Sequence, residues 1–572
     1  MKKRSYMLIA FLLGILIGAL DTGIVSPART VIADSLKLTS STSIWVVTIY
    51  TLAYAVSMPI SGKIADRYGK KKIFTFSIVI FGIGSLLCGL SNYSDSFSFL
   101  LTARVIQAIG GGGIMPIATA FIGESFPPEK RGSALGMVGA IFGIATTIGP
   151  TVGSAVLDTF GVNHWGILFF INLPICILVI ILSLISKDED TISPSKKMDI
   201  LGSFAASLLI LSLMYGLTKL DFHNFKNSIV QPNVYPYLIA FIILIPIFII
   251  IEKKAEDPII NLKYFRNRNI AITLILSFIV GCGMMGVVFV PQFGENVLRI
   301  KTGNGGYLVT LMAIFSGVSA PLGGKLIDKY SAKLILILGF TSTAIGTLVL
   351  ALITTSTSST WSLILGLAFM GLGMGFTMGT PLNYLMQSYV DKSETSSAQS
   401  TLSLVRSIGV AISPNILVGF ISAAGQNVGN NIMHILPKVN IPTGQGTTRA
   451  FDITSSFSGG SVSSKALSGF QNADVTTIFT LVKNFTSSML DKVSPMIKAQ
   501  LVAQTHNSKM NFDPIIASFK TNYLNSVDSV RVQIENTFQT TLNKGFSNLF
   551  LAAAILAFIG LIFTFLLKNK EA

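Results

Sequence analysis

Asp21 interrupts an otherwise apolar stretch that runs from Tyr6 to Val25. A carboxylate inside hydrocarbon costs about 2.5–3.5 kcal/mol on insertion scales. Helix packing does not require such a group, so an acidic residue at this depth marks a functional position that faces a cavity or a partner. The chemistry we expect of it is uptake and release of a proton.

Arg104 is predicted to lie at the same depth as Asp21. Each lies about seven residues below the outer end of its helix, so at ~1.5 Å rise per residue both are ~10 Å into the membrane. The two side chains can therefore pair, directly or through water. A nearby guanidinium favours the charged carboxylate and an apolar surrounding favours the protonated one, so relative movement would load and release a proton. A purely structural buried pair is the alternative interpretation.

The composition indicates a membrane protein with many spans. The 572 residues are 51% hydrophobic and only 12% charged, whereas a soluble domain carries roughly 25% charged residues. The net charge of +16 does not indicate nucleic-acid binding, because the basic residues lie mostly in short loops between apolar runs. That distribution follows the positive-inside rule.

Apolar runs of about 20 residues predict about fourteen membrane-spanning helices. Basic loops lie on one side, and Trp45, Trp165 and Trp361 fall at the opposite interface, which places both termini in the cytoplasm. The expected spans are 6–28, 44–64, 73–91, 97–121, 134–157, 165–186, 198–219, 235–251, 269–291, 304–324, 332–352, 361–383, 396–421 and 547–567.

The long segment 425–546 is expected outside the cell. Residues 478–490 and 527–538 have helix-like periodicity, so we expect a small helical extracellular insertion. A binding or partner-docking role is the alternative.

An internal repeat divides the chain. Residues 62–71 (GKIADRYGKK) and 324–333 (GKLIDKYSAK) match in register at Gly, Lys, Asp, a basic residue, Tyr and a final Lys. Such a repeat is typical of transporters built from two similar halves around a midplane site. The predicted fold is all-α, with two six-helix halves and two inserted helices. The expected parts are 1–190 for the first half, 191–268 for the inserted pair and linker, 269–424 for five further helices, 425–546 for the extracellular insertion, and 547–572 for the last helix and tail.

Several motifs together resemble the major facilitator superfamily, in particular its fourteen-helix drug–proton antiporter branch. The resemblance covers essentially everything except 425–546. After Asp21, however, the sequence reads TGIVSP where this branch usually has a Thr-Ile-Val-Asn run. The motifs are 62–71, 101–110 (LTARVIQAIG), 139–153 with its central Gly-Pro, 169–174 (FFINLP) and 265–268 (FRNR).

The resemblance implies roles for two groups of residues. The loop after the second helix would be a conformational latch, because a carboxylate there can hold the N-terminus of a neighbouring helix and release it in another state. The fifth helix would be a pliable helix typical of exporters, although glycines at this spacing are also common in packing. The latch residues are Gly62, Asp66, Arg67, Gly69, Lys70 and Asp328, and the exporter motif includes Gly149, Pro150 and Gly153.

A lipophilic substrate cavity is expected near the middle of the membrane, because methionine and aromatic side chains repack around varied ligands. Packing in the core or against lipid is the commoner role for such residues. Arg406, a second intramembrane cation without an obvious acidic neighbour in sequence, would either pair with carbonyl groups or bind an anionic group. The candidate cavity residues are Gln107, Met115, Phe142, Met370, Met374 and Arg406.

The resemblance implies an exporter that exchanges lipophilic drugs, cations among them, for protons and lies among the lipids of a bacterial plasma membrane. Export of an endogenous lipid or peptide is an alternative within the same class, and a membrane sensor that uses 425–546 is an alternative of another class. No nucleophile–base set, metal-ligand cluster or ATP-binding loop is recognisable, so we expect no enzyme, no metal, no cofactor and no nucleic-acid partner.

Overall fold

A computed structural model describes most of the chain, and nearly all of the described residues are helical. The predicted segment 452–476 of the insertion and the first residues of the expected spans 198–219 and 304–324 lie outside the described residues. The described residues are 2–38, 40–94, 96–186, 199–222, 224–284, 286–300, 306–437, 439–443, 447–451, 477–505 and 511–568.

In the described part of the chain, thirteen helices are long and apolar enough to cross a membrane. Helices are expected there because a helix satisfies its own backbone hydrogen bonds without water. The main helices are α1 (Lys2–Ser35), α3 (Trp45–Tyr68), α4 (Lys70–Leu90), α5 (Phe97–Ser125), α6 (Pro128–Phe160), α7 (Ile167–Phe170) leading into α8 (Asn172–Ile185), α9 (Ile200–Lys219), α11 (Tyr235–Lys254), α13 (Arg268–Gly283), α15 (Gly306–Lys329), α16 (Ala332–Leu348), α18 (Thr360–Met378), α20 (Thr395–Met433) and α24 (Arg531–Phe565).

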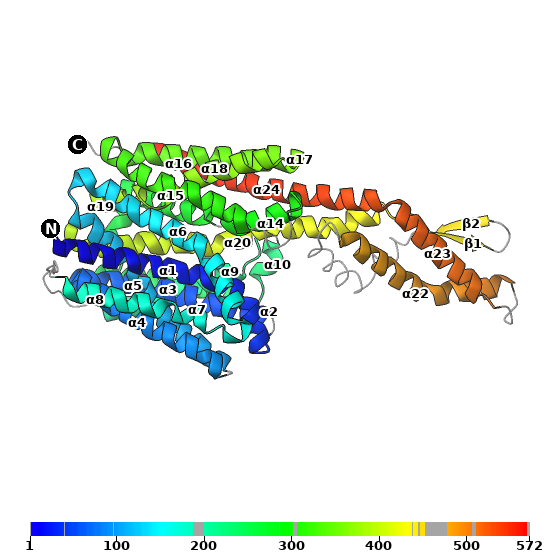
Figure 1. Ribbon diagram of the computed structural model, residues 1–572, viewed down its shortest axis with the longest axis horizontal. Coiled ribbons are helices and arrows are strands. Elements are labelled where there is room, and N and C mark those ends of the chain that lie inside the picture. Colours follow the sequence, from blue (N-terminus) through cyan, green and yellow to red (C-terminus); the bar gives the residue numbers. More distant parts are fainter. Residues whose placement is uncertain are drawn as a thin grey trace.

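Two helical halves form the bundle (Figure 1). The first half contains α1 and α3 to α8, and the second contains α13 to α20 together with α24. The halves meet where α6 packs on α15 and α3 packs on α20. The helices α9 and α11 pack on each other, and α9 packs against α3. An apolar cluster that includes Met58, Ile210 and Phe248 joins the three helices. The helices α9 and α11 are the two inserted helices of the predicted layout.

Several helix boundaries differ from the sequence prediction, and three of them change the architecture. The expected span 269–291 is divided, because α13 ends at Gly283 and α14 (Gly286–Val297) begins a new helix. Glycines at 281 and 283 weaken a helix interior by about 1 kcal/mol each. In contrast, α20 continues beyond the expected end at 421, and α24 begins before the expected start at 547. Their polar outer ends remain helical because they pack into a second core outside the bundle.

That second core belongs to the extension, which we define as the described residues of 425–546. The outer ends of α20 and α24 pack there with α22 (Ile478–Thr505) and α23 (Asp513–Ser529) around Ile478, Val527 and Phe538. The helix expected over 527–538 is interrupted at Val530, between α23 and α24. The extension also carries an antiparallel hairpin of β1 (Val439–Thr443) and β2 (Thr447–Phe451). It projects from the end of the bundle opposite to both chain termini (Figure 1).

Replacing Phe538 with Ala is expected to loosen the extension without unfolding the bundle. The Phe538 side chain is fully buried in the second core, and removing a buried Phe costs about 3–5 kcal/mol. Limited proteolysis of the full-length protein should cleave the variant inside the extension and leave the bundle helices intact. Val532→Ala on the same helix is the control, because Val532 is 66% exposed. Equal protease resistance of Phe538→Ala and wild type would contradict this account of the core.

Candidate functional site

Asp21 on α1 lies in a closed network of polar side chains inside the first half. Its carboxylate accepts hydrogen bonds from Arg104 Nη1 at 3.0 Å, from Gln107 Nε2 at 2.8 Å and from Asn172 Nδ2 at 2.9 Å. The side chains of Asp21 and Arg104 are 1% and 2% exposed. The structure thus brings together the two charges predicted at matched depth, as a direct ion pair.

The guanidinium of Arg104 is enclosed by aromatic rings and backbone. Its Cζ lies 4.6 Å from the ring centroid of Tyr50 and 5.1 Å from that of Phe169. Its Nε donates to the Val46 carbonyl at 3.4 Å. Cation–π contacts of this kind contribute about 2 kcal/mol when the cation is desolvated. Arg104 is therefore fixed by its surroundings, and Asp21 is the partner whose protonation can change the net charge.

Three members of the network differ from the site expected from sequence. Gln107, expected to line the substrate cavity, is fully buried and bonds Asp21 and Ser85 instead. The close approach of α4 to α5 at Gly84 explains this placement, because a Cβ on Gly84 would lie 2.6 Å from the Gln107 Cβ. Asn172 and Ser85 were not expected in the site. Asn172 belongs to the FFINLP motif, which was the only available sign.

The glycines of α6 bring that helix against the network. Gly149 packs directly on Gly23 of α1, because a Cβ placed on Gly149 would lie 2.8 Å from the Gly23 Cα. Gly149 and Gly153 are buried whereas Pro150 is exposed. The helix α6 continues through Pro150 to Phe160, so the proline removes a backbone donor without ending the helix. The predicted exporter motif thus contacts α1 at Gly23, two residues after Asp21.

A second carboxylate, Asp66 at the end of α3, caps the N-terminus of α20 in the other half. It accepts from the backbone N–H groups of Ser396 and Ser397 at 2.9 and 2.7 Å, and from the Ser397 hydroxyl at 2.7 Å. Gly62 makes this approach possible, since a Cβ there would lie 2.7 Å from the Ser396 carbonyl oxygen. We call this contact the Asp66 cap.

The other predicted latch residues surround the Asp66 cap. Lys70 lies 3.6 Å from Asp66 and 3.1 Å from Glu124. Gly69 has φ +103° and turns the chain between α3 and α4, in a backbone conformation that favours glycine. Arg67 stacks on the neighbouring Tyr68 ring at 5.2 Å.

Asp328 at the end of α15 forms the equivalent contact, from the second half to a helix of the first half. We call this contact the Asp328 cap. Asp328 accepts from the backbone N–H groups of Gly132 and Ser133 at 2.7 and 2.8 Å. These groups lie near the N-terminus of α6, so each half caps a helix of the other half. The sequence repeat at 62–71 and 324–333 is thereby a structural repeat.

The linker between α11 and α13 covers the Asp66 cap. Asp257 pairs with Lys63, which lies three residues before Asp66. Asn261 Nδ2 and the Tyr264 hydroxyl each donate to Glu394 at 3.1 Å, and Glu394 immediately precedes α20. Burial and the nearby Glu394 charge raise the pKa of Tyr264 well above its ordinary value, so the phenol remains a donor. The inserted helices are thus tied to both sides of this cap.

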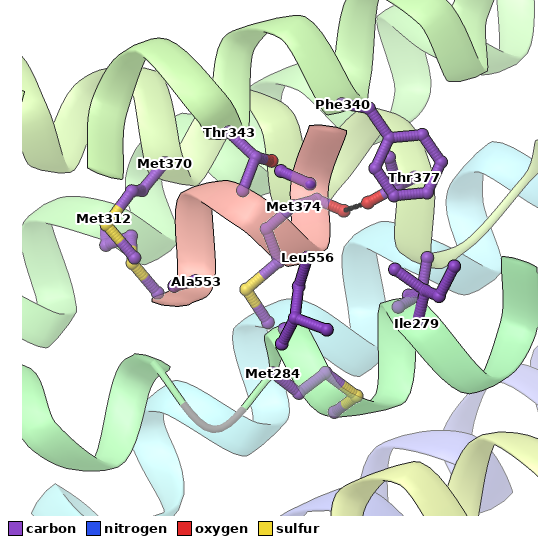
Figure 2. A pocket seen from close by; sticks show the side chains of 13 residues that line it. Ile279, Met284, Met312, Phe340, Thr343, Met370, Met374, Thr377, Ala553 and Leu556 are labelled. Atoms are coloured by element: carbon purple, nitrogen blue, oxygen red, sulfur yellow. Dashed lines mark hydrogen bonds between the residues drawn. The ribbon is translucent and has the colours of Figure 1, made fainter. Parts of the chain in front are cut away.

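A methionine-lined cavity of about 50 Å³ lies within the second half, and Figure 2 shows the side chains of Met284, Met312, Met370 and Met374 around it. Its lining also contains Thr343 and Thr377, whose hydroxyls donate to carbonyls of their own helices.

Met370 and Met374 are the expected cavity residues that line this cavity. Phe142 packs among several apolar clusters of the bundle. Met115 and Arg406 contact each other across the two halves, with 3.9 Å between Met115 Sδ and Arg406 Nη2.

Cys88, Cys176 and Cys282 are buried and unpaired with one another. In the described ranges, no three His, Cys, Asp or Glu side chains are grouped so that they could hold a metal ion. What the geometry offers is a buried carboxylate paired with Arg104 inside the first half and two contacts that hold the halves together at one end.

Comparisons with known proteins agree with this architecture. The family model described as Major Facilitator Superfamily matches residues 11–414. An uncharacterized MFS-type transporter, YfiU of Bacillus subtilis (strain 168), is 39% identical over 436 residues, covering 75% of this chain and 82% of that protein. Multidrug resistance protein 3 of the same organism is 32% identical over 415 residues, covering 72% and 79%.

Among solved structures, the human organic anion transporter MFSD10 matches with a TM-score of 0.53 and 13% identity. The match covers 73% of this chain and 93% of that one. At this identity the similarity supports the fold alone.

Proposed function

Since the chain belongs to the Major Facilitator Superfamily of membrane transporters, we propose that it is a proton-coupled antiporter of the fourteen-helix drug-export branch. It would export lipophilic small molecules, cations among them, across a bacterial plasma membrane. The observation that carries the proposal is the buried Asp21–Arg104 pair within a bundle related to multidrug resistance protein 3.

In this mechanism Asp21 is the proton carrier and Arg104 is its modulator. While the network is closed, the carboxylate accepts hydrogen bonds from three donors. Motion of α1 relative to α5 would lengthen the contact with Arg104, and the isolated carboxylate would then take up a proton. Substrate would leave and protons would enter by alternating access around a midplane site.

The Asp66 and Asp328 caps would act as latches at the cytoplasmic end. Each holds a helix N-terminus, where the helix dipole favours a negative charge. Both would have to break before the halves separate there. The basic loops predicted on that side, and the location of both termini at one end of the bundle, support this orientation. The extension would then lie outside the cell.

The proposal is tested by efflux of fluorescent lipophilic probes from bacteria that lack their own pumps. The panel contains a cation such as ethidium and a neutral dye of similar size. We expect cells that express the protein to extrude at least one probe, and a protonophore to stop the extrusion. If a well-expressed protein extrudes none of them, drug export is contradicted and an endogenous lipid or peptide becomes the better substrate class. Efflux that persists with the protonophore would contradict proton coupling.

A further inference from the structure

Arg406 is a buried cation for which the described part of the chain provides no carboxylate. It lies on α20 with 6% of its surface exposed. Its Nη1 donates to the Met378 carbonyl at 3.1 Å, and its Nη2 donates to the Ser403 hydroxyl at 3.4 Å. The ion pairs formed by described residues do not include Arg406. A desolvated charge that only neutral dipoles compensate is costly, and an anion at this position would remove that cost.

The position of Arg406 is that of a substrate site in a transporter of this fold. It lies about 16 Å along α20 from the start of that helix at Thr395, at 1.5 Å rise per residue, which is near the middle of the membrane. Its contacts join α18 of the second half, through Met378, to α5 of the first half, through Met115. A ligand bound there would touch both halves.

A second observation is the Tyr50 hydroxyl, which is buried and has no hydrogen-bond partner among the described residues. The Tyr50 ring stacks with that of Tyr54 at 5.8 Å, and both rings lie against Gly111. Tyr54 lies one turn before Met58 on α3, and Met58 Sδ lies 3.9 Å from the hydroxyl of Ser407, which follows Arg406 on α20. Gly111 and Met115 are one turn apart on α5, so the Tyr50 hydroxyl and Arg406 approach this helix at neighbouring turns.

The methionine cavity is lined by residues that are next in sequence to two contacts of Arg406. Met378 follows Thr377, and Gly281, which packs on the Arg406 backbone, follows Val280. Thr377 and Val280 both line the methionine cavity of Figure 2. That cavity of about 50 Å³ is smaller than a typical ligand site. The flexible methionine side chains can move apart around an apolar group.

We propose that Arg406, with the hydroxyls of Tyr50 and Tyr54, binds the carboxylate of a lipophilic acid whose apolar part enters the methionine cavity. The proposal rests on the proposed export function and adds amphiphiles with an anionic group to its substrates. Asp21 neutralises Arg104, so Arg406 is left as the net charge at the interface between the halves. That charge favours an acid over its uncharged ester.

The test compares N-dansylphenylalanine with its methyl ester, which differ in one negative charge. Binding to the purified full-length protein is followed by dansyl fluorescence, so it does not depend on transport. We expect wild type to bind the acid about tenfold more tightly than the ester, because one charge-assisted contact contributes about that much. Arg406→Gln should lose this preference, because it should bind the acid as weakly as wild type binds the ester. Arg406→Lys should keep most of the preference for the acid. Arg299→Gln is the control, because Arg299 is exposed.

Tyr54→Phe provides a variant that retains Arg406 and its contacts. It should weaken binding of the acid several-fold and leave binding of the ester unchanged. The proposal is overturned if wild type does not prefer the acid, or if Arg406→Gln folds and weakens both ligands equally. Protonophore-sensitive efflux of the ester, measured separately, decides the proposed export function, so failure of one does not imply failure of the other.

Discussion

Replacing Asp21 with Asn is expected to abolish proton-coupled efflux. The amide cannot carry the charge that balances Arg104, and its NH₂ group faces Gln107 and Asn172, which are themselves donors to this position. Efflux driven by a proton gradient should fall to the level of cells without the transporter. Downhill exchange of substrate across the membrane, which requires no net proton movement, should persist.

The decisive measurement is substrate-driven proton release from proteoliposomes that contain the variant. Leaving Arg104 buried without its partner costs about 3–5 kcal/mol, so folding is checked by size-exclusion chromatography. The double variant Asp21→Asn with Arg104→Gln removes both charges and relieves that cost. Asp34→Asn is the matched control, since Asp34 lies on the same helix and is exposed. Proton release at the wild-type rate from either Asp21 variant would rule out Asp21 as the carrier.

Substitution of Gly62 by Ala is expected to open the end of the bundle that the Asp66 cap holds closed. The added Cβ would lie 2.0 Å from the Ser400 hydroxyl and 2.7 Å from the Ser396 carbonyl, so α3 and α20 would have to separate. Asp66→Asn should act in the same direction, because a hydrogen bond to a charged group contributes about 1.5–3 kcal/mol. If the closed state loses about 3 kcal/mol of stabilisation, the equilibrium between the closed and open states of this end shifts by roughly a hundredfold.

Nitroxide labels on cysteines introduced at Lys72 and Lys392 would report this change, because both positions are exposed and belong to different halves. The native cysteines are buried. The distance between the labels should increase in Gly62→Ala and Asp66→Asn. It should not increase in Gly82→Ala, where the new Cβ meets only Cys176 at ordinary contact distance, 3.5 Å. An unchanged distance together with normal efflux in Asp66→Asn would remove the latch role.

The sequence was sufficient to predict the ion pair of the site but not its neighbours. The depth of a residue along a membrane helix follows from residue count alone, so the sequence predicts Asp21 and Arg104 at the same depth. Asn172 could not be assigned, because a single Asn in an apolar helix does not indicate which way it points. Gln107 was expected to line a cavity, whereas the close approach of α4 at Gly84 directs it to Asp21.

The fold was predictable for a similar reason, since apolar length identifies membrane helices and the internal repeat identifies the two halves. Three features could not be predicted from hydropathy or from local sequence patterns. The break after Gly283 occurs within one uninterrupted apolar run, where hydropathy gives no sign of it. The outer parts of α20 and α24 are polar, so hydropathy ended both helices too early. The linker contacts of Asp257 and Glu394 depend on tertiary packing, which a local pattern does not report.

The uninterrupted course of α20 has a mechanical consequence. This helix of 39 residues is ~58 Å long at 1.5 Å per residue. Ser396 and Ser397 lie at one tip, and Val428 and Ile432 of the extension core lie near the other. It therefore acts as a lever, and by the same geometry a tilt of about 10° would swing its far tip by roughly 10 Å. An antibody fragment that clamps the extension against the rim of the bundle would hold this lever still and arrest turnover.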